Sequence, residues 1–186
     1  MTHYTKTSLL IFALLLSTVS VAAKLPNADK VLADAKAKAA AQNKNVLLVF
    51  GTSWCPPCKQ FEKFLADQRI QSIFDQHFVL ATVAVGEEAG GDARKNNPGS
   101  AELLVKLGGV HSGSTGVPFI LVIDPQGKII ATSERPVPGQ KIGDNIGYPT
   151  EPEEIAWFMT MMKQGAPSLN EDEARSLEDW FRKNTD

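Results

Sequence analysis

The sequence predicts an α/β fold in which a mixed central sheet is covered by helices on both faces. Short, continuous apolar runs, typical of strands buried on both faces of a sheet, alternate along the chain with segments whose apolar residues recur at helical spacing. An Asp-Pro-Gln-Gly sequence at residues 124–127 follows the last of these runs, with Pro and Gly where a tight turn uses them. The next strand should therefore return antiparallel, and the sheet should contain both strand directions.

Residues 1–23 have the pattern of a secretory signal peptide. A short polar start with one lysine is followed by an apolar run that ends in the small residues Val21-Ala22-Ala23, so cleavage is expected before Lys24. The alternative is a membrane anchor, but a spanning helix needs about 20 apolar residues, and this run is shorter and carries hydroxyl groups near its end. We therefore expect a periplasmic or secreted protein with no stable membrane insertion after cleavage.

Five elements are predicted in the first half of the mature chain. Residues 27–43 are alanine-rich and form a helix whose start Asn27 or Asp29 can cap. Residues 46–50 form a buried strand, and residues 55–66 form a helix with phenylalanines at helical spacing. A second short helix covers residues 69–75, and residues 78–85 form another buried strand.

The second half begins with a loop rich in Gly, Asn and charge at residues 86–99, after which Ser100 should cap a short helix. Residues 119–123 form the third strand and residues 128–131 pair back on it as a hairpin. Residues 133–149 form a long Pro/Gly loop. Both loops could hold determinants of specificity, although as exposed connectors they need no function.

Two helices end the chain. Residues 151–163 carry the apolar stripe of a helix packed on a sheet: Ile155, Phe158, Met159 and Met162. In the last segment Asn170 and Glu173 form a capping-box pattern before Leu177 and Phe181. We expect residues 24–165 to form the main domain and residues 166–186 to form a C-terminal helical appendage docked on it.

The composition limits the classes of function. The 186 residues, 43% of them hydrophobic and 22% charged, suit an ordinary globular chain of about one domain. The net charge of −2 provides no basic surface for nucleic acid, so no nucleic-acid partner is expected. The only cysteines are Cys55 and Cys58, which excludes a small protein stabilised by several disulfides and a protein with several zinc sites.

These two cysteines follow a predicted strand directly, in a Trp-Cys-Pro-Pro-Cys-Lys sequence at residues 54–59. At the start of a helix, unpaired backbone N–H groups and the positive end of the helix dipole favour a thiolate. Because both prolines lack an N–H group, the donors left for the Cys55 sulfur are Cys58 and Lys59. We expect a thiolate that is favoured, but not extremely so.

A zinc site and a purely structural disulfide are the alternatives to redox chemistry. A structural zinc site needs about four protein ligands, and the mature chain offers only His77 and His111 to complete one, without paired spacing. We therefore expect no metal and no cofactor, and we interpret His111 as an ordinary loop residue. The order of strand, tryptophan, cysteine pair and helix favours a redox pair over a structural clip.

Trp54, Cys55, Cys58 and Lys59, together with the later Gly-Val-Pro-Phe sequence at residues 116–119 and the hairpin turn, resemble the thioredoxin family. The resemblance covers roughly residues 46–162, and the sequence after the second cysteine is most similar to exported thioredoxin-like proteins and to the thioredoxin-like domain of transmembrane thiol reductases. It implies a thioredoxin-like mixed sheet with a cis peptide bond before Pro118. It also implies that Trp54 covers the redox pair and that Val117 and Pro118 align a substrate strand.

The chain departs from the family at the proton acceptor. Cytosolic thioredoxins carry a buried aspartate six residues before the first cysteine, and this position is Val49 here. Glu62, one helical turn after Cys58, is the available substitute, although it could also be a plain solvated glutamate. The absence of a histidine between the cysteines argues against a dedicated disulfide donor.

These features predict a protein-disulfide reductase or interchange enzyme with Cys55 as nucleophile, Cys58 as resolving thiol and Glu62 as proton acceptor. Its expected partners are disulfide-containing exported proteins and a membrane thiol reductase that donates electrons. Two alternatives remain: a binding or folding-assistance module whose cysteines do not turn over, and a specialist that handles thiols on a cytochrome or copper pathway.

Overall fold

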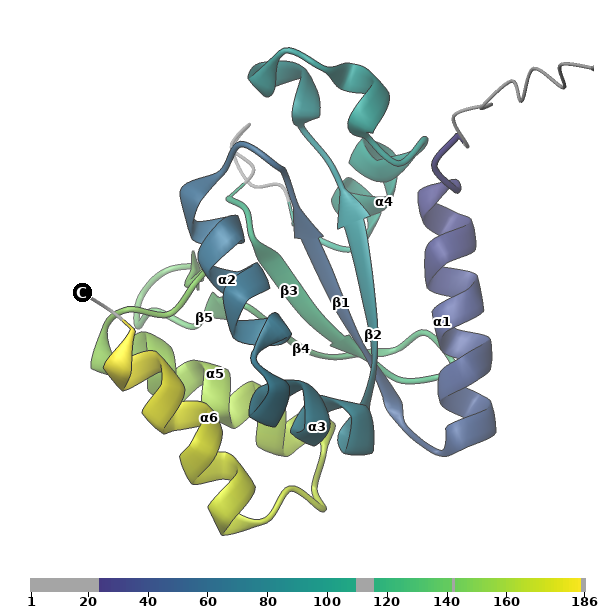
Figure 1. Cartoon of the computed structure of the whole chain (residues 1–186). Coiled ribbons are helices and arrows are strands. Elements are labelled where there is room, and N and C mark those ends of the chain that lie inside the picture. Colours follow the sequence, from purple (N-terminus) through teal and green to yellow (C-terminus); the bar gives the residue numbers. More distant parts are fainter. Residues whose placement is uncertain (1–23, 110–115, 142, 185–186) are drawn as a thin grey trace, which may run out of the picture.

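The computed structural model describes residues 24–109, 116–141 and 143–184 (Figure 1). The predicted signal peptide and His111 lie outside these residues. Four strands form the central sheet in the order β2-β1-β3-β4: β1 (Asn45–Gly51), β2 (Phe78–Ala84), β3 (Phe119–Ile123) and β4 (Ile129–Thr132). β1 is parallel to β2 and antiparallel to β3, and β4 returns antiparallel to β3. The predicted mixed α/β sheet is therefore confirmed.

The central strands are buried more completely than the edge strand β2. All five residues of β3 and the five middle residues of β1 are buried, as their continuous apolar runs predict. In β2, by contrast, Leu80 is 42% exposed and Thr82 is also exposed. The prediction of a fully buried strand was wrong here, because β2 has only one neighbouring strand and is fully covered on only one face.

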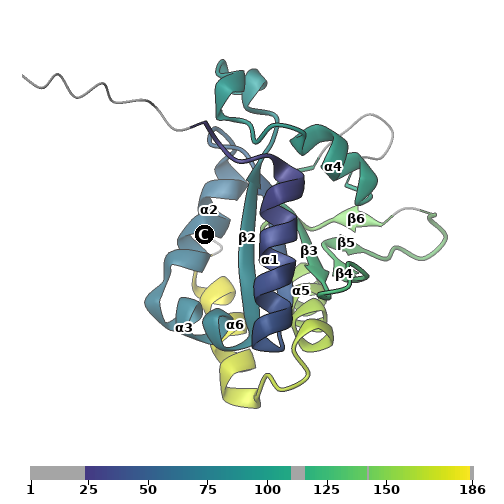
Figure 2. The ribbon, with the colours of Figure 1, turned by 90° about the vertical axis from the view of Figure 1, so that its right-hand side faces the viewer.

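Helices cover both faces of the sheet, as Figures 1 and 2 show from two directions. On one face lie α1 (Ala28–Gln42) and α4 (Ser100–Lys106). The buried residues of α1 are alanines, whose short side chains allow the helix to lie close to the strands. The opposite face carries four helices: α2 (Pro56–Ala66), α3 (Gln68–His77), α5 (Pro152–Gly165) and α6 (Glu171–Lys183).

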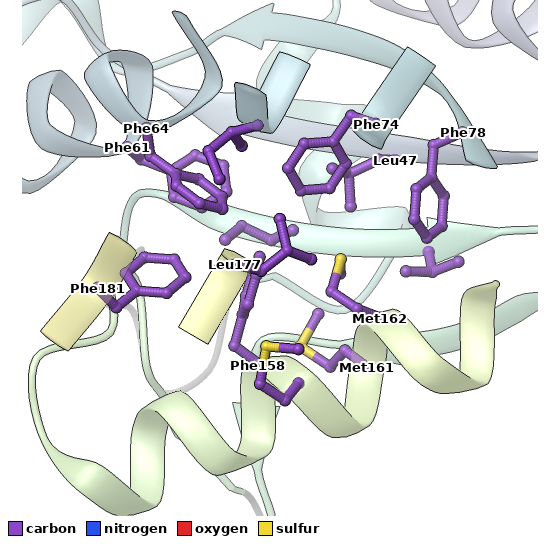
Figure 3. Close-up of a cluster of buried hydrophobic side chains, with 14 of the residues drawn as sticks. Leu47, Phe61, Phe64, Phe74, Phe78, Phe158, Met161, Met162, Leu177 and Phe181 are labelled. Atoms are coloured by element: carbon purple, nitrogen blue, oxygen red, sulfur yellow. The ribbon is translucent and has the colours of Figure 1, made fainter. Parts of the chain in front are cut away.

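The core under these four helices is rich in phenylalanine and methionine (Figure 3). Phe181 of α6 is fully buried, and its ring centroid lies 4.4 Å from that of Phe64 and 5.0 Å from that of Phe158. Aromatic pairs at such distances contribute about 0.5–1.5 kcal/mol each beyond the burial of their area. The predicted stripe of α5 is buried throughout. The terminal helix thus supplies side chains to the same core as the helices before it.

The predicted helix starts are confirmed with one exception. The Asn27 side chain accepts from Asp29 N–H at the start of α1, and Asn170 and Glu173 form the predicted capping box of α6. Ser100, however, is not a cap but the first helical residue of α4, and it is buried. The cap is Gly99, whose φ of 76° turns the chain into the helix through a left-handed conformation that glycine adopts without strain.

The two long loops contain short structure of their own. Residues 86–99 include the 3₁₀ turns η1 (Glu87–Gly90) and η2 (Ala93–Lys95). Residues 133–149 include the small antiparallel pair of β5 (Glu134–Arg135) and β6 (Asp144–Asn145). Both loops also bury polar side chains: Glu87, Asn97 and Ser133. They are therefore more than exposed connectors. Among the described residues, no helix is long and apolar enough to cross a membrane.

Candidate redox-active site

The cysteine pair lies at the start of α2, where β1 ends. Cys55 is the N-cap residue, and Pro56 follows at the first helical position, where its missing N–H costs no hydrogen bond. Cys55 and Cys58 form a disulfide with their Cα atoms 5.3 Å apart, and they are only 4% and 3% exposed. The Cys58 N–H donates to the Cys55 sulfur at 3.2 Å, as expected, whereas Lys59 N–H donates to the Cys55 carbonyl instead.

The segment before β3 lies against the first cysteine. The Val117–Pro118 peptide bond is cis, as the family resemblance implies, and the Val117 carbonyl oxygen lies 3.4 Å from the Cys55 sulfur. Asn145 of β6 holds this segment, because its amide donates to the carbonyl oxygens of Gly116 at 2.8 Å and Pro118 at 3.2 Å. Its own oxygen accepts from the buried Ser133 hydroxyl at 2.6 Å. The small β5–β6 pair thus fixes the segment that faces the disulfide.

Trp54 lies beside the pair and is fixed by the loop after β2. Its indole N–H donates to the Gly86 carbonyl at 3.0 Å, and its ring packs so closely on Gly90 that a Cβ atom there would collide with it. The side chain remains 45% exposed. Trp54 therefore presents an exposed aromatic surface of fixed orientation directly before the first cysteine.

A pocket of about 160 Å³ lies behind Cys58. Its lining includes Val49, at the position of the family's buried aspartate, and Glu62, which is exposed at the pocket rim. It also includes Glu87, which is only 4% exposed. A buried carboxylate therefore does share a pocket with the second cysteine, although it comes from the loop after β2 and not from β1.

A family model described as thioredoxin-like matches residues 27–125, which is just over half of the chain. The chain belongs to the thioredoxin-like family. It is similar to proteins named thiol:disulfide interchange protein DsbD, with 34% identity over 92 residues in Photorhabdus laumondii and 32% over 112 residues in Yersinia pestis. These matches cover 49% and 60% of this chain, but only 14% and 16% of the two relatives. The chain thus corresponds to one small part of them.

Among solved structures, the thioredoxin-like chain is similar to a disulphide isomerase from Xylella fastidiosa, with 21% identity and a TM-score of 0.48 over 86% of this chain and 92% of that one. It is also similar to the C-terminal domain of DsbD from Neisseria meningitidis, with 18% identity and a TM-score of 0.40 over 59% and 84% of the two chains.

The structure brings the predicted residues of this thioredoxin-like site together. The Val117 carbonyl contacts the Cys55 sulfur, and Trp54, which directly precedes Cys55, lines a surface hollow with Val117. Glu62 and Pro118 lie on the pocket that Cys58 also lines. Sequence reasoning missed Glu87 and Asn145, because each lay in a segment interpreted as an exposed loop. Within the described residues, no three His, Cys, Asp or Glu side chains are grouped so as to hold a metal ion.

Proposed function

We propose that this chain is an exported thiol–disulfide oxidoreductase that reduces or exchanges disulfides in other exported proteins. One observation carries the proposal: a Cys55–Cys58 disulfide at a helix start, with the cis Val117–Pro118 segment against the first sulfur. An extended substrate segment can pair with exposed backbone beside such a proline and bring its own disulfide to Cys55.

In the reducing direction, the Cys55 thiolate attacks one sulfur of a substrate disulfide, and the other sulfur leaves as a thiolate that takes up a proton. Cys58 then loses its proton and attacks the Cys55 sulfur of the mixed disulfide, which releases the second substrate thiol. The substrate gains two electrons, and the chain is left with the Cys55–Cys58 disulfide. An external dithiol donor must reduce this disulfide before the next cycle, and we propose a membrane thiol reductase for that role.

The first step is favoured by the position of Cys55. The N–H of Cys58 points at its sulfur, and the helix dipole of α2 adds partial positive charge, so both stabilise the thiolate. In the second step Glu62 is the proposed proton acceptor for Cys58, because it lines the same pocket and is open to solvent, where it can pass the proton on.

The test is disulfide reduction of insulin, with the reduction potential measured against glutathione. We expect the wild-type chain to turn over and Cys55→Ser to lose at least about 1,000-fold in rate, because the nucleophile is removed. Cys58→Ala should instead accumulate mixed disulfides with its clients. If the wild-type chain reduces no insulin and Cys58→Ala forms no mixed disulfide, the cysteines do not exchange with substrates and the protein is a binding module.

Trapping with Cys58→Ala in a periplasmic extract also distinguishes the client class. Many unrelated trapped proteins would indicate a general reductase, whereas a single cytochrome-pathway or copper-pathway protein would indicate a specialist. Cys55→Ser/Cys58→Ala is the matched control, since it has no thiol with which to form a mixed disulfide.

A further inference from the structure

Glu87 is a buried residue that is fixed by hydrogen bonds through both its carboxylate and its backbone N–H. One carboxylate oxygen accepts from the Ser53 N–H at 2.7 Å and the other accepts from the Ser53 hydroxyl at 2.7 Å. The Glu87 N–H in turn donates to the Asn96 side chain at 3.0 Å. Ser53 lies two residues before Cys55, so these contacts attach the loop after β2 to the chain that leads into the redox pair.

The carboxylate remains charged in spite of its burial. Burial by itself raises the pKa of Glu87, but the hydrogen bonds from Ser53, with further help from Thr52 and the positive charge of Lys95, outweigh it and hold the pKa below its ordinary value. The buried Thr52 hydroxyl lines the same pocket as Glu87, but no hydrogen-bond partner among the described residues lies within the usual distance and angle limits. At neutral pH Glu87 is therefore a fixed negative charge.

This charged residue shares a mainly apolar pocket with the second cysteine. Cys58 and Glu87 both line it, and Val49, Phe61, Leu65 and Val83 contribute apolar walls. Charges separated by apolar protein interact more strongly than charges separated by water. The other charged groups facing Glu87 are Glu62 from α2 and Lys95 from η2, and both are exposed and so better screened by solvent.

We propose that Glu87 is a positioning residue for the redox pair: it fixes the Ser53 backbone before Cys55 and supplies the fixed negative charge that keeps Cys58 a thiol while Cys55 is a thiolate. This inference rests on the proposed function. It gives the two sulfurs opposite environments, because the α2 N-terminus favours the Cys55 thiolate and the Glu87 carboxylate disfavours the Cys58 thiolate. Only Cys55 is then available for the first attack.

The charge also affects the direction of exchange. A thiolate stabilised by its surroundings makes the reduced protein more stable and the pair more oxidising, and a destabilised thiolate makes the pair more reducing. Glu87 should thus favour reduction of clients. At a pH where the thiols ionise, Glu87→Gln should shift the equilibrium with glutathione by about tenfold toward the reduced protein, which is about 30 mV. The shift should vanish at low pH, where both thiols are protonated in either protein.

Titration of Cys58 alone tests the role of Glu87. Since the chain has only two cysteines, Cys55→Ser leaves one thiol, whose ionisation can be followed through the cysteine Cβ chemical shift by NMR. We expect Cys58 in this variant to titrate above the ordinary cysteine value of about 8.5. Adding Glu87→Gln keeps the shape of the side chain: the amide oxygen can still accept from the Ser53 N–H, and the amide nitrogen can donate to the Ser53 hydroxyl oxygen in place of accepting from it. This variant should lower the Cys58 pKa by about one unit, whereas Glu87→Asp, which keeps the charge, should not.

Glu88→Gln is the matched control, because Glu88 follows Glu87 in the same turn but is exposed and should leave the titration unchanged. The inference is overturned if Cys58 titrates at or below about 8.5 in Cys55→Ser, whether or not the double variant folds. It is also overturned if Glu87→Gln and Glu88→Gln give the same titration. Neither outcome depends on disulfide exchange, so the proposed function is tested separately by the insulin assay.

Discussion

The redox end of the molecule and the end formed by α5 and α6 are stabilised by different interactions. Around the disulfide, named polar contacts fix the chain: Glu87 to Ser53, Trp54 to Gly86, and Asn145 to Gly116 and Pro118. Under α6, fully buried aromatic rings pack on one another without polar partners. Hydrogen bonds fix orientation at modest net free energy, whereas apolar burial supplies most of the stability. The first arrangement suits a reactive site and the second a scaffold.

The largest effect is expected at the aromatic end. Phe181→Ala should lower the free energy of unfolding by about 3–5 kcal/mol, because it leaves a cavity next to Phe64 and Phe158. Urea denaturation measures the loss, and Val105→Ala, at a side chain that is 61% exposed, should cost less than about 0.5 kcal/mol. A loss for Phe181→Ala as small as that of the control would contradict the assignment of this end as the scaffold.

Asn145→Ala should have the next largest effect, now at the redox end. It removes the acceptor of the buried Ser133 O–H and the donor to the Gly116 carbonyl, at a cost of about 2 kcal/mol in stability. Disulfide exchange should also slow, because the segment that faces Cys55 loses its support. Asn184→Ala removes an exposed amide contact and is the matched control for both measurements. If exchange were as fast as in the control, Asn145 would have no role in the site.

Glu62→Gln tests the site without affecting the scaffold. The substitution should slow resolution of the mixed disulfide by about tenfold, or about 1.4 kcal/mol, because Cys58 loses its proposed proton acceptor. Stability should not change, since the side chain is exposed. Rapid acid-quench kinetics measure the rate at which the mixed disulfide is resolved. Glu102→Gln, on the exposed first turn of α4, is the control. An unchanged resolution rate would make Glu62 a plain surface residue.

The smallest effect concerns a polar contact at the aromatic end. Burial raises the pKa of Glu173, but hydrogen bonds from the Asn170 N–H and His77 outweigh it, so the pKa in the folded state is lower than its ordinary value of 4.5. Glu173 therefore stabilises the fold above about pH 4.5, and this contribution is lost as the pH falls through the folded pKa.

Glu173→Gln should accordingly remove about 0.5 kcal/mol of stability at pH 7 and much less at pH 3. Urea unfolding at the two pH values measures the difference, with Glu171→Gln on the same exposed turn as control. A larger loss at pH 3 than at pH 7 would show that the charged Glu173 carboxylate does not stabilise the fold.

The sequence predicted most of the elements because their signals are local. The buried runs of β1 and β3, the Asn27 cap, and the Asn170 and Glu173 box all depend on neighbours within four residues. Ser100 failed as a cap because a preceding glycine takes the capping conformation, and Leu80 is exposed because its strand lies at the sheet edge. The first case has a local cause in the neighbouring residue, whereas in the second the tertiary position of the strand decided the outcome.

The sequence by itself determined the redox pair, its helix and the family of the fold, since a strand, two cysteines at helix spacing and a later Val-Pro-Phe each carry their meaning locally. Only the tertiary structure decided which residues of the long loops support that pair. Glu87 reaches Ser53 across 34 residues and Asn145 reaches Gly116 across 29. No periodicity encodes contacts of that separation, because they depend on how the loops after β2 and β4 fold back over the sheet.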